Sequence, residues 1–273
     1  MRQAVVESDF FSVLDLAQSF FQIPLASTVD PILRLVQPAL VCIKIRRCAW
    51  GCTISTGLLQ SALTGILADF YFAGCIIYCD DILAYSHAVK EQHMTLLHRV
   101  LDKLRQAGAV LKVAKMFIAR TSLTFLGMTL SREGWTIAPK YLASVKCATI
   151  PTKEKDWRCF IGLVNWQFLP GASHLLKTLN SQLKGETKDI KEAWTERHTD
   201  NFNQIKGMLL KAPLLAHPNF AKPFAVYSDA NDLGIGAVLT QGDTERSPKK
   251  RQYRVVAYFS RSFIDVEQRY ATP

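Results

Sequence analysis

The stretch Ile76-Ile77-Tyr78-Cys79-Asp80-Asp81-Ile82-Leu83 places two adjacent carboxylates at the tip of an otherwise apolar run. Apolar residues on both sides of a short polar tip predict two strands joined by a tight turn. Two like charges beside a core are costly unless a positive charge compensates them, and a divalent cation is the usual compensation. The alternative is an ordinary solvated hairpin turn, in which Asp is common.

A second segment upstream supplies another carboxylate. Asp9-Phe10-Phe11-Ser12-Val13-Leu14-Asp15-Leu16 is strand-like and delivers Asp15 at its polar end. Carboxylates from two separate strand ends, here Asp15 with Asp80 and Asp81, are what a two-metal phosphoryl-transfer site needs. We therefore expect the three carboxyl groups to converge, on the order of 4–7 Å apart.

These two segments resemble the catalytic motifs of reverse transcriptases, and most closely those of gypsy-type LTR retrotransposons and of retroviral Pol polyproteins. Residues 11–16 with 20–25 are similar to the first catalytic motif, and 78–81 to the Tyr-x-Asp-Asp box. Other stretches resemble further parts of the family: the nucleotide and template support (57–62, weakly), the palm helix and strand (97–117), the primer grip and next strand (125–137), the thumb helix (160–166) and the first strands of a tethered ribonuclease H domain (222–261).

The resemblance implies an α+β fold class. It predicts a reverse-transcriptase palm, in which an antiparallel sheet packs with helices, then a helical thumb, and finally a truncated ribonuclease H-like α/β domain. The expected boundaries are 1–131 for the palm with incomplete fingers, 132–185 for the thumb, 186–222 for a connecting segment and 223–273 for the N-terminal part of the ribonuclease H-like domain.

The resemblance also implies a catalytic and a nucleotide-binding set. Asp15, Asp80 and Asp81 would bind two Mg²⁺ ions, with Mn²⁺ as an alternative, and thereby carry catalysis. Phe20 would be the aromatic steric gate that excludes a ribose 2′-hydroxyl, and Gly57 would contact the nucleotide. The alternative for Phe20 is a simple core aromatic.

Two further sites follow from the resemblance alone. Leu126, Gly127 and Met128 would hold the primer strand, or else merely end a buried strand. Asp229 would be the first metal-binding residue of ribonuclease H, or else a strand-end Asp entering a turn at Asn231.

The chain departs from the family in several places. The basic fingers segment that normally precedes Phe11 is not in the sequence, Ser55-Thr56 replace an expected Pro-Phe, and the other acidic residues of ribonuclease H would fall beyond Pro273. We therefore expect polymerisation by this chain to be impaired and ribonuclease H activity to be absent. The alternative functions are an inactive remnant that binds nucleic acid, and a ribonuclease H acting on RNA–DNA hybrids.

Composition indicates a globular, basic protein. Hydrophobic residues make up 49% and charged residues 21%, and the net charge is +10. A basic balance suits a polyanionic partner, although it also serves simple solubility. The expected partners are an RNA or DNA template with its primer and deoxynucleoside triphosphates, with other Pol segments as further candidates and no membrane. The sequence lacks the pattern of a signal peptide, and we expect an intracellular protein, cytoplasmic or nuclear.

Periodicity and turn residues predict the remaining elements. One helix is expected to be capped by Ser86 and to end at Gly108. A second helix is expected after Thr152, and a third after Thr195 that ends before Pro213. Strands are expected at 109–113, 123–130, 224–229, 233–240 and 253–260. A polar linker is expected at 184–192. A basic loop is expected at 244–254, and it could contact phosphates, serve as a nuclear import signal or simply be solvated.

The cysteines and two histidines are expected to be unremarkable. The 7 cysteines show no disulfide framework, and a metal knuckle at Cys42, Cys48 and Cys52 lacks a completing histidine, so buried thiols are expected. His93 and His98 do not share a helix face and are expected at the surface.

Overall fold

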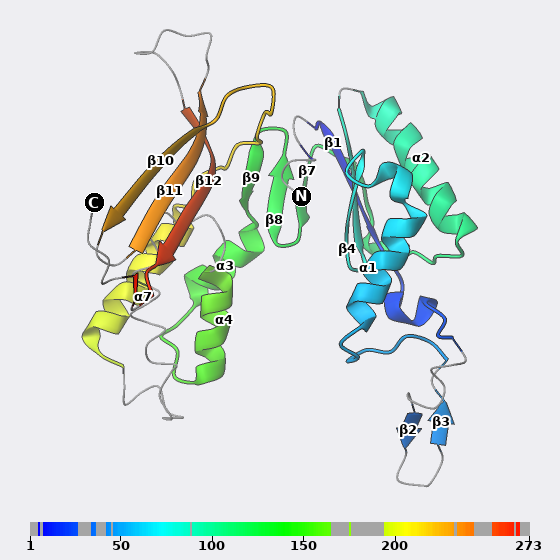
Figure 1. The fold of residues 1–273 in the computed structure, drawn as a ribbon, viewed down its shortest axis with the longest axis horizontal. Helices are drawn as coiled ribbons and strands as arrows, with labels where there is room; N and C mark the ends of the chain where they lie inside the picture. Colours follow the sequence, from blue (N-terminus) through cyan, green and yellow to red (C-terminus); the bar gives the residue numbers. More distant parts are fainter. Residues whose placement is uncertain are drawn as a thin grey trace. The chain divides into compact units, whose positions relative to one another are not determined.

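The computed structural model describes residues 5, 8–26, 34–36, 42–44, 46–87, 89–164, 175, 194–231, 234–242, 253–264 and 266–267. The chain divides into two compact units, Met1–Phe125 and Leu126–Pro273, whose elements are labelled in Figure 1. The predicted linker at 184–192, the end of the predicted turn at Asp232 and most of the predicted basic loop lie outside the described residues.

The first unit is built on an antiparallel sheet. Its strands lie in the order β4 (Cys75–Tyr78), β5 (Asp81–Ser86), β1 (Phe10–Asp15) and β6 (Phe117–Arg120). The predicted hairpin is confirmed, because β4 and β5 pair from Cys75 opposite Ala84 to Tyr78 opposite Asp81. The two segments that carry the carboxylates are therefore neighbouring strands of one sheet.

Two helices cover one face of this sheet. Helices α1 (Ser55–Ile66) and α2 (Lys90–Gln106) lie side by side in Figure 1, and their buried leucines pack with Leu14 and Ile82 of the sheet. Gly108, with φ +72°, follows the end of α2 as predicted. The predicted cap at Ser86 is wrong, because Ser86 is the last residue of β5 and Val89 precedes the helix without a side-chain cap.

Short elements complete the first unit: the 3-10 helices η1 (Ser19–Gln22), η3 (Ala68–Phe70) and η4 (Val113–Lys115), and the strands β2 (Arg34–Val36), β3 (Cys42–Lys44) and β7 (Ser122–Phe125). The predicted strand at 109–113 is wrong. Leu111 forms an isolated bridge with Leu16, and η4 follows. A single strand at 123–130 is also wrong, because Leu126 (φ 48°) and Gly127 (φ 77°) adopt left-handed conformations after β7.

The second unit begins with a hairpin and contains helices held together by aromatic rings. Strands β8 (Met128–Ser131) and β9 (Gly134–Ile137) pair, and α3 (Pro139–Cys147), α4 (Glu154–Val164) and α7 (Glu196–Leu210) follow. The helices predicted after Thr152 and Thr195 are thus confirmed. Phe160 of α4 contacts Phe202 of α7, with ring centroids 4.4 Å apart.

A three-stranded antiparallel sheet ends the second unit, in the order β10 (Ala225–Asn231), β11 (Gly234–Gly242) and β12 (Tyr253–Ser262). The three strands predicted here are confirmed. With the antiparallel sheets and helices of both units, the structure confirms the α+β fold class.

A short segment after α7 joins the β8–β9 hairpin to this sheet. Trp135 and Leu215 exchange backbone hydrogen bonds of 2.8 and 2.9 Å, and the Ala216 N–H donates to the carbonyl of Val255 at 2.7 Å. Gly134 has φ +149°, and a Cβ atom built there would lie 2.1 Å from the carbonyl oxygen of Leu215. His217 completes the junction, because its Nδ1 accepts from the indole N–H of Trp135 at 2.8 Å and its Nε2 lies 2.7 Å from the Ser131 carbonyl oxygen.

Burial corrects two sequence expectations. Cys48 and Cys75 are buried thiols as expected, whereas Cys147 and Cys159 are exposed. His98 is at the surface, but His93 is fully buried, so the expectation for His93 is wrong. No helix in the described part of the chain has the length and apolar character needed to cross a membrane.

Candidate active site

Asp15 and Asp81 stand opposite each other at one end of the sheet. They are register partners in the antiparallel pairing of β1 with β5, and Asp80 occupies the turn that leads into β5. The backbone fixes this end further, because the Leu16 N–H donates to the Asp80 carbonyl at 3.3 Å. The structure therefore brings two of the predicted residues together by strand pairing and the third by the turn.

The turn between β4 and β5 has an unusual backbone conformation that α1 supports. Cys79 has φ 55°, a left-handed conformation that is strained for a non-glycine residue. The side chain of Gln60 on α1 accepts from the Cys79 N–H at 2.9 Å and donates to the Ile77 carbonyl at 3.1 Å. Gln60 thereby anchors the turn that presents Asp80.

Lys115 compensates the negative charge of the site. Its Nζ donates to Oδ2 of Asp15 at 3.0 Å, and this hydrogen bond together with the charge of Asp15 raises the Lys115 pKa. Asp15 is buried, with 8% of its surface exposed. The pKa of Asp81 is raised by burial first, then by the charges of Asp80 and Asp15, and is lowered by Lys115. Asp80 and Asp15 are thus both close enough to Asp81 for their charges to act on its carboxyl group.

The donor chemistry of this set suits a hard divalent cation, because such ions prefer carboxylate oxygens. After burial, the charges of Asp80 and Asp15 also raise the pKa of Asp81, and a bound cation would offset these two charges. Within the described ranges, however, no three His, Cys, Asp or Glu side chains are gathered closely enough to hold a metal ion. The separation of the three carboxyl groups therefore stays a prediction.

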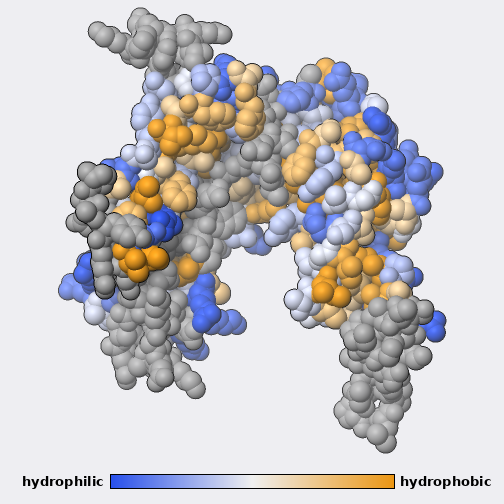
Figure 2. Space-filling view, viewed as in Figure 1, coloured by the Kyte–Doolittle hydropathy of each residue, from blue (hydrophilic) through white to orange (hydrophobic). Residues whose placement is uncertain are grey.

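The predicted nucleotide-binding residues lie near the same end of the first unit. Phe20, in η1, is half-buried and packs against the core that α1 and α2 form with the sheet. The next residue, Phe21, is exposed and contacts Trp50, with ring centroids 5.2 Å apart. Gly57 lies in the first turn of α1, and a Cβ atom there would meet nothing within 4 Å. Figure 2 shows hydrophobic residues at the surface of this end of α1, where Ile54 and other apolar side chains are exposed.

The remaining predicted site residues belong to the second unit. Leu126 and Gly127 form the left-handed turn that precedes Met128, the first residue of β8. Gly127 also accepts a backbone hydrogen bond from Ala138 at 3.1 Å. Asp229 is exposed on β10, opposite Gly236 of β11. The roles of these residues in primer and metal binding stay predictions.

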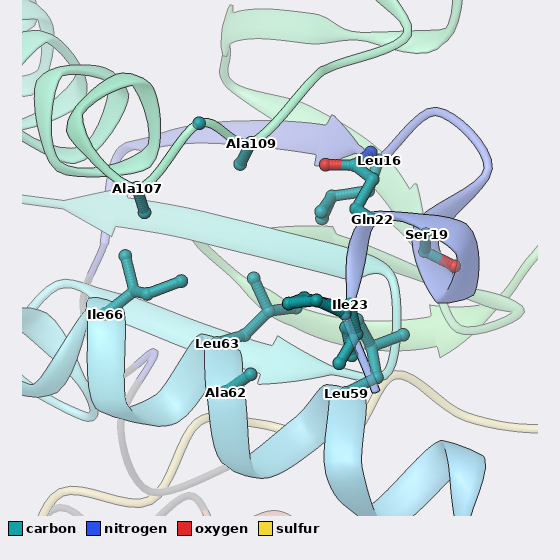
Figure 3. Close-up of a pocket in the computed structure, with 12 residues that line it drawn as sticks. Leu16, Ser19, Gln22, Ile23, Leu59, Ala62, Leu63, Ile66, Ala107 and Ala109 are labelled. Atoms are coloured by element: carbon teal, nitrogen blue, oxygen red, sulfur yellow. The ribbon is translucent and has the colours of Figure 1, made fainter. Parts of the chain in front are cut away.

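A cavity of about 170 Å³ lies behind the carboxylate end of β1. Figure 3 shows its lining from three directions: Leu59, Leu63 and Ile66 from α1, Leu16 from the end of β1, and Ala109 after α2. Its lining is mostly aliphatic and contains no carboxylate, so it is separate from the candidate chemistry.

Sequence reasoning missed two residues that shape the site. Lys115 lies 100 positions after Asp15, and Gln60 lies 19 positions before Cys79. Neither belongs to a spacing pattern that predicts such a contact, because both meet their partners only through the packing of the unit. Gln60 falls inside the stretch that resembles the nucleotide and template support, which was the one available signal.

Two parts of this chain match known protein families. Residues 3–130 match the family "Reverse transcriptase (RNA-dependent DNA polymerase)", and residues 194–273 match the "RNase H-like domain found in reverse transcriptase". The region that matches the reverse transcriptases contains all three carboxylates of the candidate site.

Its relatives are transposon Pol polyproteins. The chain is 28% identical over 277 residues to the "Retrovirus-related Pol polyprotein from transposon opus" of Drosophila melanogaster, covering 96% of this chain and 26% of that protein. It is 30% identical over 224 residues to the "Transposon Tf2-7 polyprotein" of Schizosaccharomyces pombe, covering 81% of this chain and 16% of that protein. The chain thus spans 26% of the first of these relatives and 16% of the second, and the resemblance to gypsy-type LTR elements is confirmed.

Solved structures show the same fold. The foamy viral protease-reverse transcriptase in complex with an RNA/DNA hybrid aligns with a TM-score of 0.82 at 22% identity, covering 99% of this chain and 36% of that one. A second foamy viral structure, in complex with double-stranded DNA, gives a TM-score of 0.80 at 24% identity over 98% of this chain and 46% of that one. The predicted reverse-transcriptase fold is confirmed.

Proposed function

We propose that this chain supplies the polymerase site of an RNA-directed DNA polymerase that works by two-metal nucleotidyl transfer. The observation that carries the proposal is the pairing of Asp15 with Asp81 across β1 and β5, with Asp80 in the adjoining turn. Asp15, Asp80 and Asp81 would hold Mg²⁺ or Mn²⁺. Bound cations at such a site activate the attacking hydroxyl and stabilise the leaving pyrophosphate.

The other side chains would position the substrates. Phe20 would lie under the sugar of the incoming nucleotide and Gly57 close to it, while Leu126, Gly127 and Met128 would contact the primer. The proposed partners are a primed RNA or DNA template and deoxynucleoside triphosphates. The net charge of +10 supports a nucleic-acid partner, as does the content of the foamy viral structures, one with an RNA/DNA hybrid and one with double-stranded DNA.

Primer extension tests this proposal. The assay uses the 273-residue chain, and the same chain preceded by the fingers segment of a related element, each with Mg²⁺ and with Mn²⁺. The sequence departures predict extension near background for the first protein and measurable extension for the second. Asp80→Asn should abolish extension, and Asp102→Asn, at an exposed position on α2, should leave it unchanged. Extension that survives Asp80→Asn would refute the proposed site.

The same proteins separate the alternatives. Salt-dependent binding to a primer–template duplex without extension in either protein would favour the nucleic-acid-binding remnant over the polymerase. If the chain cleaves an RNA–DNA hybrid and Asp229→Asn abolishes this cleavage, the result would favour the ribonuclease H hypothesis. Absence of hybrid cleavage, with extension that depends on Asp80, supports the polymerase alone.

A further inference from the structure

A buried histidine links three strands behind the carboxylate site. His93 of α2 is fully buried, its Nε2 lies 2.7 Å from Oγ of Ser12 on β1, and its Nδ1 lies 2.9 Å from Oγ of Ser86 on β5. The same Ser12 Oγ accepts the N–H of Ala119 on β6 at 2.9 Å. One imidazole thus connects a helix with both strands that carry the carboxylates.

A neutral imidazole satisfies this network completely. It offers one N–H donor and one acceptor nitrogen, and a serine hydroxyl can donate or accept. One serine therefore donates to the ring while the other accepts from it, whichever nitrogen carries the proton. Burial also lowers the pKa of His93, which favours the neutral ring. Loss of the ring would leave the hydroxyl of Ser12, which is fully buried, without this partner.

The network and the carboxylates lie on opposite faces of the sheet. Side chains alternate along a strand, so residues three or five positions apart face opposite ways. Ser12 precedes Asp15 by three positions, and Ser86 follows Asp81 by five, so both serines point away from the carboxylates. The network is on the face that α2 covers, since Leu14 and Ile82, with the same alternation, pack against that helix.

The pairing of β1 with β5 sets Asp15 opposite Asp81 and runs without a shift from Phe10 to Asp15. The His93 bridge acts across this pairing, because Ser86 lies two positions beyond Ala84, the register partner of Ser12. The pairing on the other side of β1 is irregular. The pairing of β1 with β6 shifts between Phe11 and Val13, and Ala119 has φ 48°. The Ser12 hydroxyl replaces a backbone carbonyl as the acceptor for the Ala119 N–H. A shift of one residue in a strand moves every side chain to the other face, which would carry Asp15 away from Asp81.

We propose that His93 is a positioning residue for the carboxylate site: by bridging Ser12 and Ser86 from α2, it fixes the register in which Asp15 stands opposite Asp81. The inference rests on the proposed function, because the register matters for metal binding by these carboxylates. It assigns a role in that function to a side chain that touches neither metal nor substrate.

The test compares His93→Leu with Leu97→Ala in the whole chain. Leu97 is buried in the same helix and the same core but belongs to no part of the network, so it controls for loss of packing. Cross-strand NMR contacts between Asp15 and Asp81 report the register, and Mn²⁺ binding by proton relaxation reports the site. We expect His93→Leu to lose the contacts and to bind Mn²⁺ roughly ten-fold more weakly, the low end of the cost of losing a residue that orients a metal ligand. Leu97→Ala should lower only the melting temperature.

The inference would be overturned if His93→Leu kept both the cross-strand contacts and the Mn²⁺ affinity. The two variants, His93→Leu and Leu97→Ala, would then differ only in stability. If His93→Leu does not fold, Ser86→Ala decides instead, because it removes one bridge, keeps the imidazole and leaves the Ser12 hydroxyl to accept from Ala119. Failure of the wild-type chain to bind Mn²⁺ would refute the proposed function. The cross-strand contacts would then still decide the role of His93.

Discussion

Lys115 is the residue that balances charge at the carboxylate site. It lowers the pKa of Asp81 against the raising effects of burial, Asp80 and Asp15. Lys115→Met should therefore raise the Asp81 pKa further, as measured by carbon-13 NMR titration of the carboxyl groups. Lys112→Met is the matched control, because Lys112 contacts Asp15 through its backbone N–H and not its side chain. An unchanged Asp81 titration in Lys115→Met would contradict the assigned charge balance.

A structural role and a nucleotide-binding role of Gly57 can be tested separately. Its position in α1 has no contact within 4 Å of an added Cβ, and the same holds for Gly65 in the same helix. Each change to Ala should therefore stabilise the protein by roughly 0.5–1 kcal/mol, measured by urea unfolding. Only Gly57→Ala should weaken nucleotide binding. Equal nucleotide affinity in both variants would remove Gly57 from the proposed site.

At the scale of elements, the turn between β4 and β5 depends on α1. Gln60→Leu removes the acceptor for the Cys79 N–H and the donor to the Ile77 carbonyl. We expect a loss of roughly 1–3 kcal/mol of unfolding free energy, because a partly buried N–H is left unsatisfied. Amide exchange at Cys79 should also quicken, as followed by NMR. The exposed residue Gln106, at the end of α2, supplies the control Gln106→Leu, and an equal effect there would argue against the anchor.

The junction between the β8–β9 hairpin and the segment after α7 should respond to pH. The indole N–H of Trp135 can only donate, so Nδ1 of His217 must accept and Nε2 must carry the proton that reaches the Ser131 carbonyl. A second proton on the ring would break the bond to Trp135. Burial lowers the pKa of His217 below its ordinary value of 6.5, against the opposing effect of the Ser131 carbonyl.

The sign of the pH effect follows from that shift. As the pH falls below about 6.5, the unfolded chain takes up the proton first, so the free energy of unfolding is largest above this pH and decreases on acidification. His217→Gln keeps an acceptor and a donor but does not titrate, so its stability should fall less between pH 7.5 and pH 5, measured by urea unfolding at each pH. His98→Gln, at an exposed position, should keep the wild-type dependence, and a His217→Gln variant that did the same would refute this role.

Elements with a local signal were predictable from the sequence, and those set by distant contacts were not. The apolar run around Asp80 and the helix after Thr195 were predicted because their patterns are contiguous. The strand at 123–130 was wrong because Leu126, which does not favour left-handed backbone, precedes Gly127 in the turn. His93 was placed at the surface because helical spacing cannot show that two serines from separate strands meet its ring.

At the scale of the whole molecule, the positive charge should govern nucleic-acid binding. A chain of net charge +10 that neutralises about six phosphates of a duplex should lose roughly a thousand-fold in affinity between about 50 and 200 mM salt. Fluorescence anisotropy with a labelled primer–template measures this slope, and Asp80→Asn should leave it nearly unchanged because that carboxylate is not a phosphate contact. Affinity independent of salt would exclude a surface that follows the phosphates.

The fold and the family resemblance could be predicted from the sequence because the two carboxylate motifs are specific when they occur together. The charge balance of the site was not, because it depends on Lys115 reaching Asp15 across 100 positions of chain. Likewise, the pairing of Asp15 with Asp81 required the order of strands in the sheet, which the sequence only implied through the resemblance.

The close approach at Gly134 bears on how this gene can change over generations. Since any other side chain would collide with the backbone of Leu215, a nucleotide change that replaces this glycine harms the protein whether or not it still polymerises DNA. Retention of glycine at position 134 therefore indicates selection for a folded product, whereas retention of Asp80 indicates selection for catalysis. In a copy that drifts freely, both codons should decay at the same rate. In a copy retained only for binding, the codon for Gly134 should outlast the codon for Asp80.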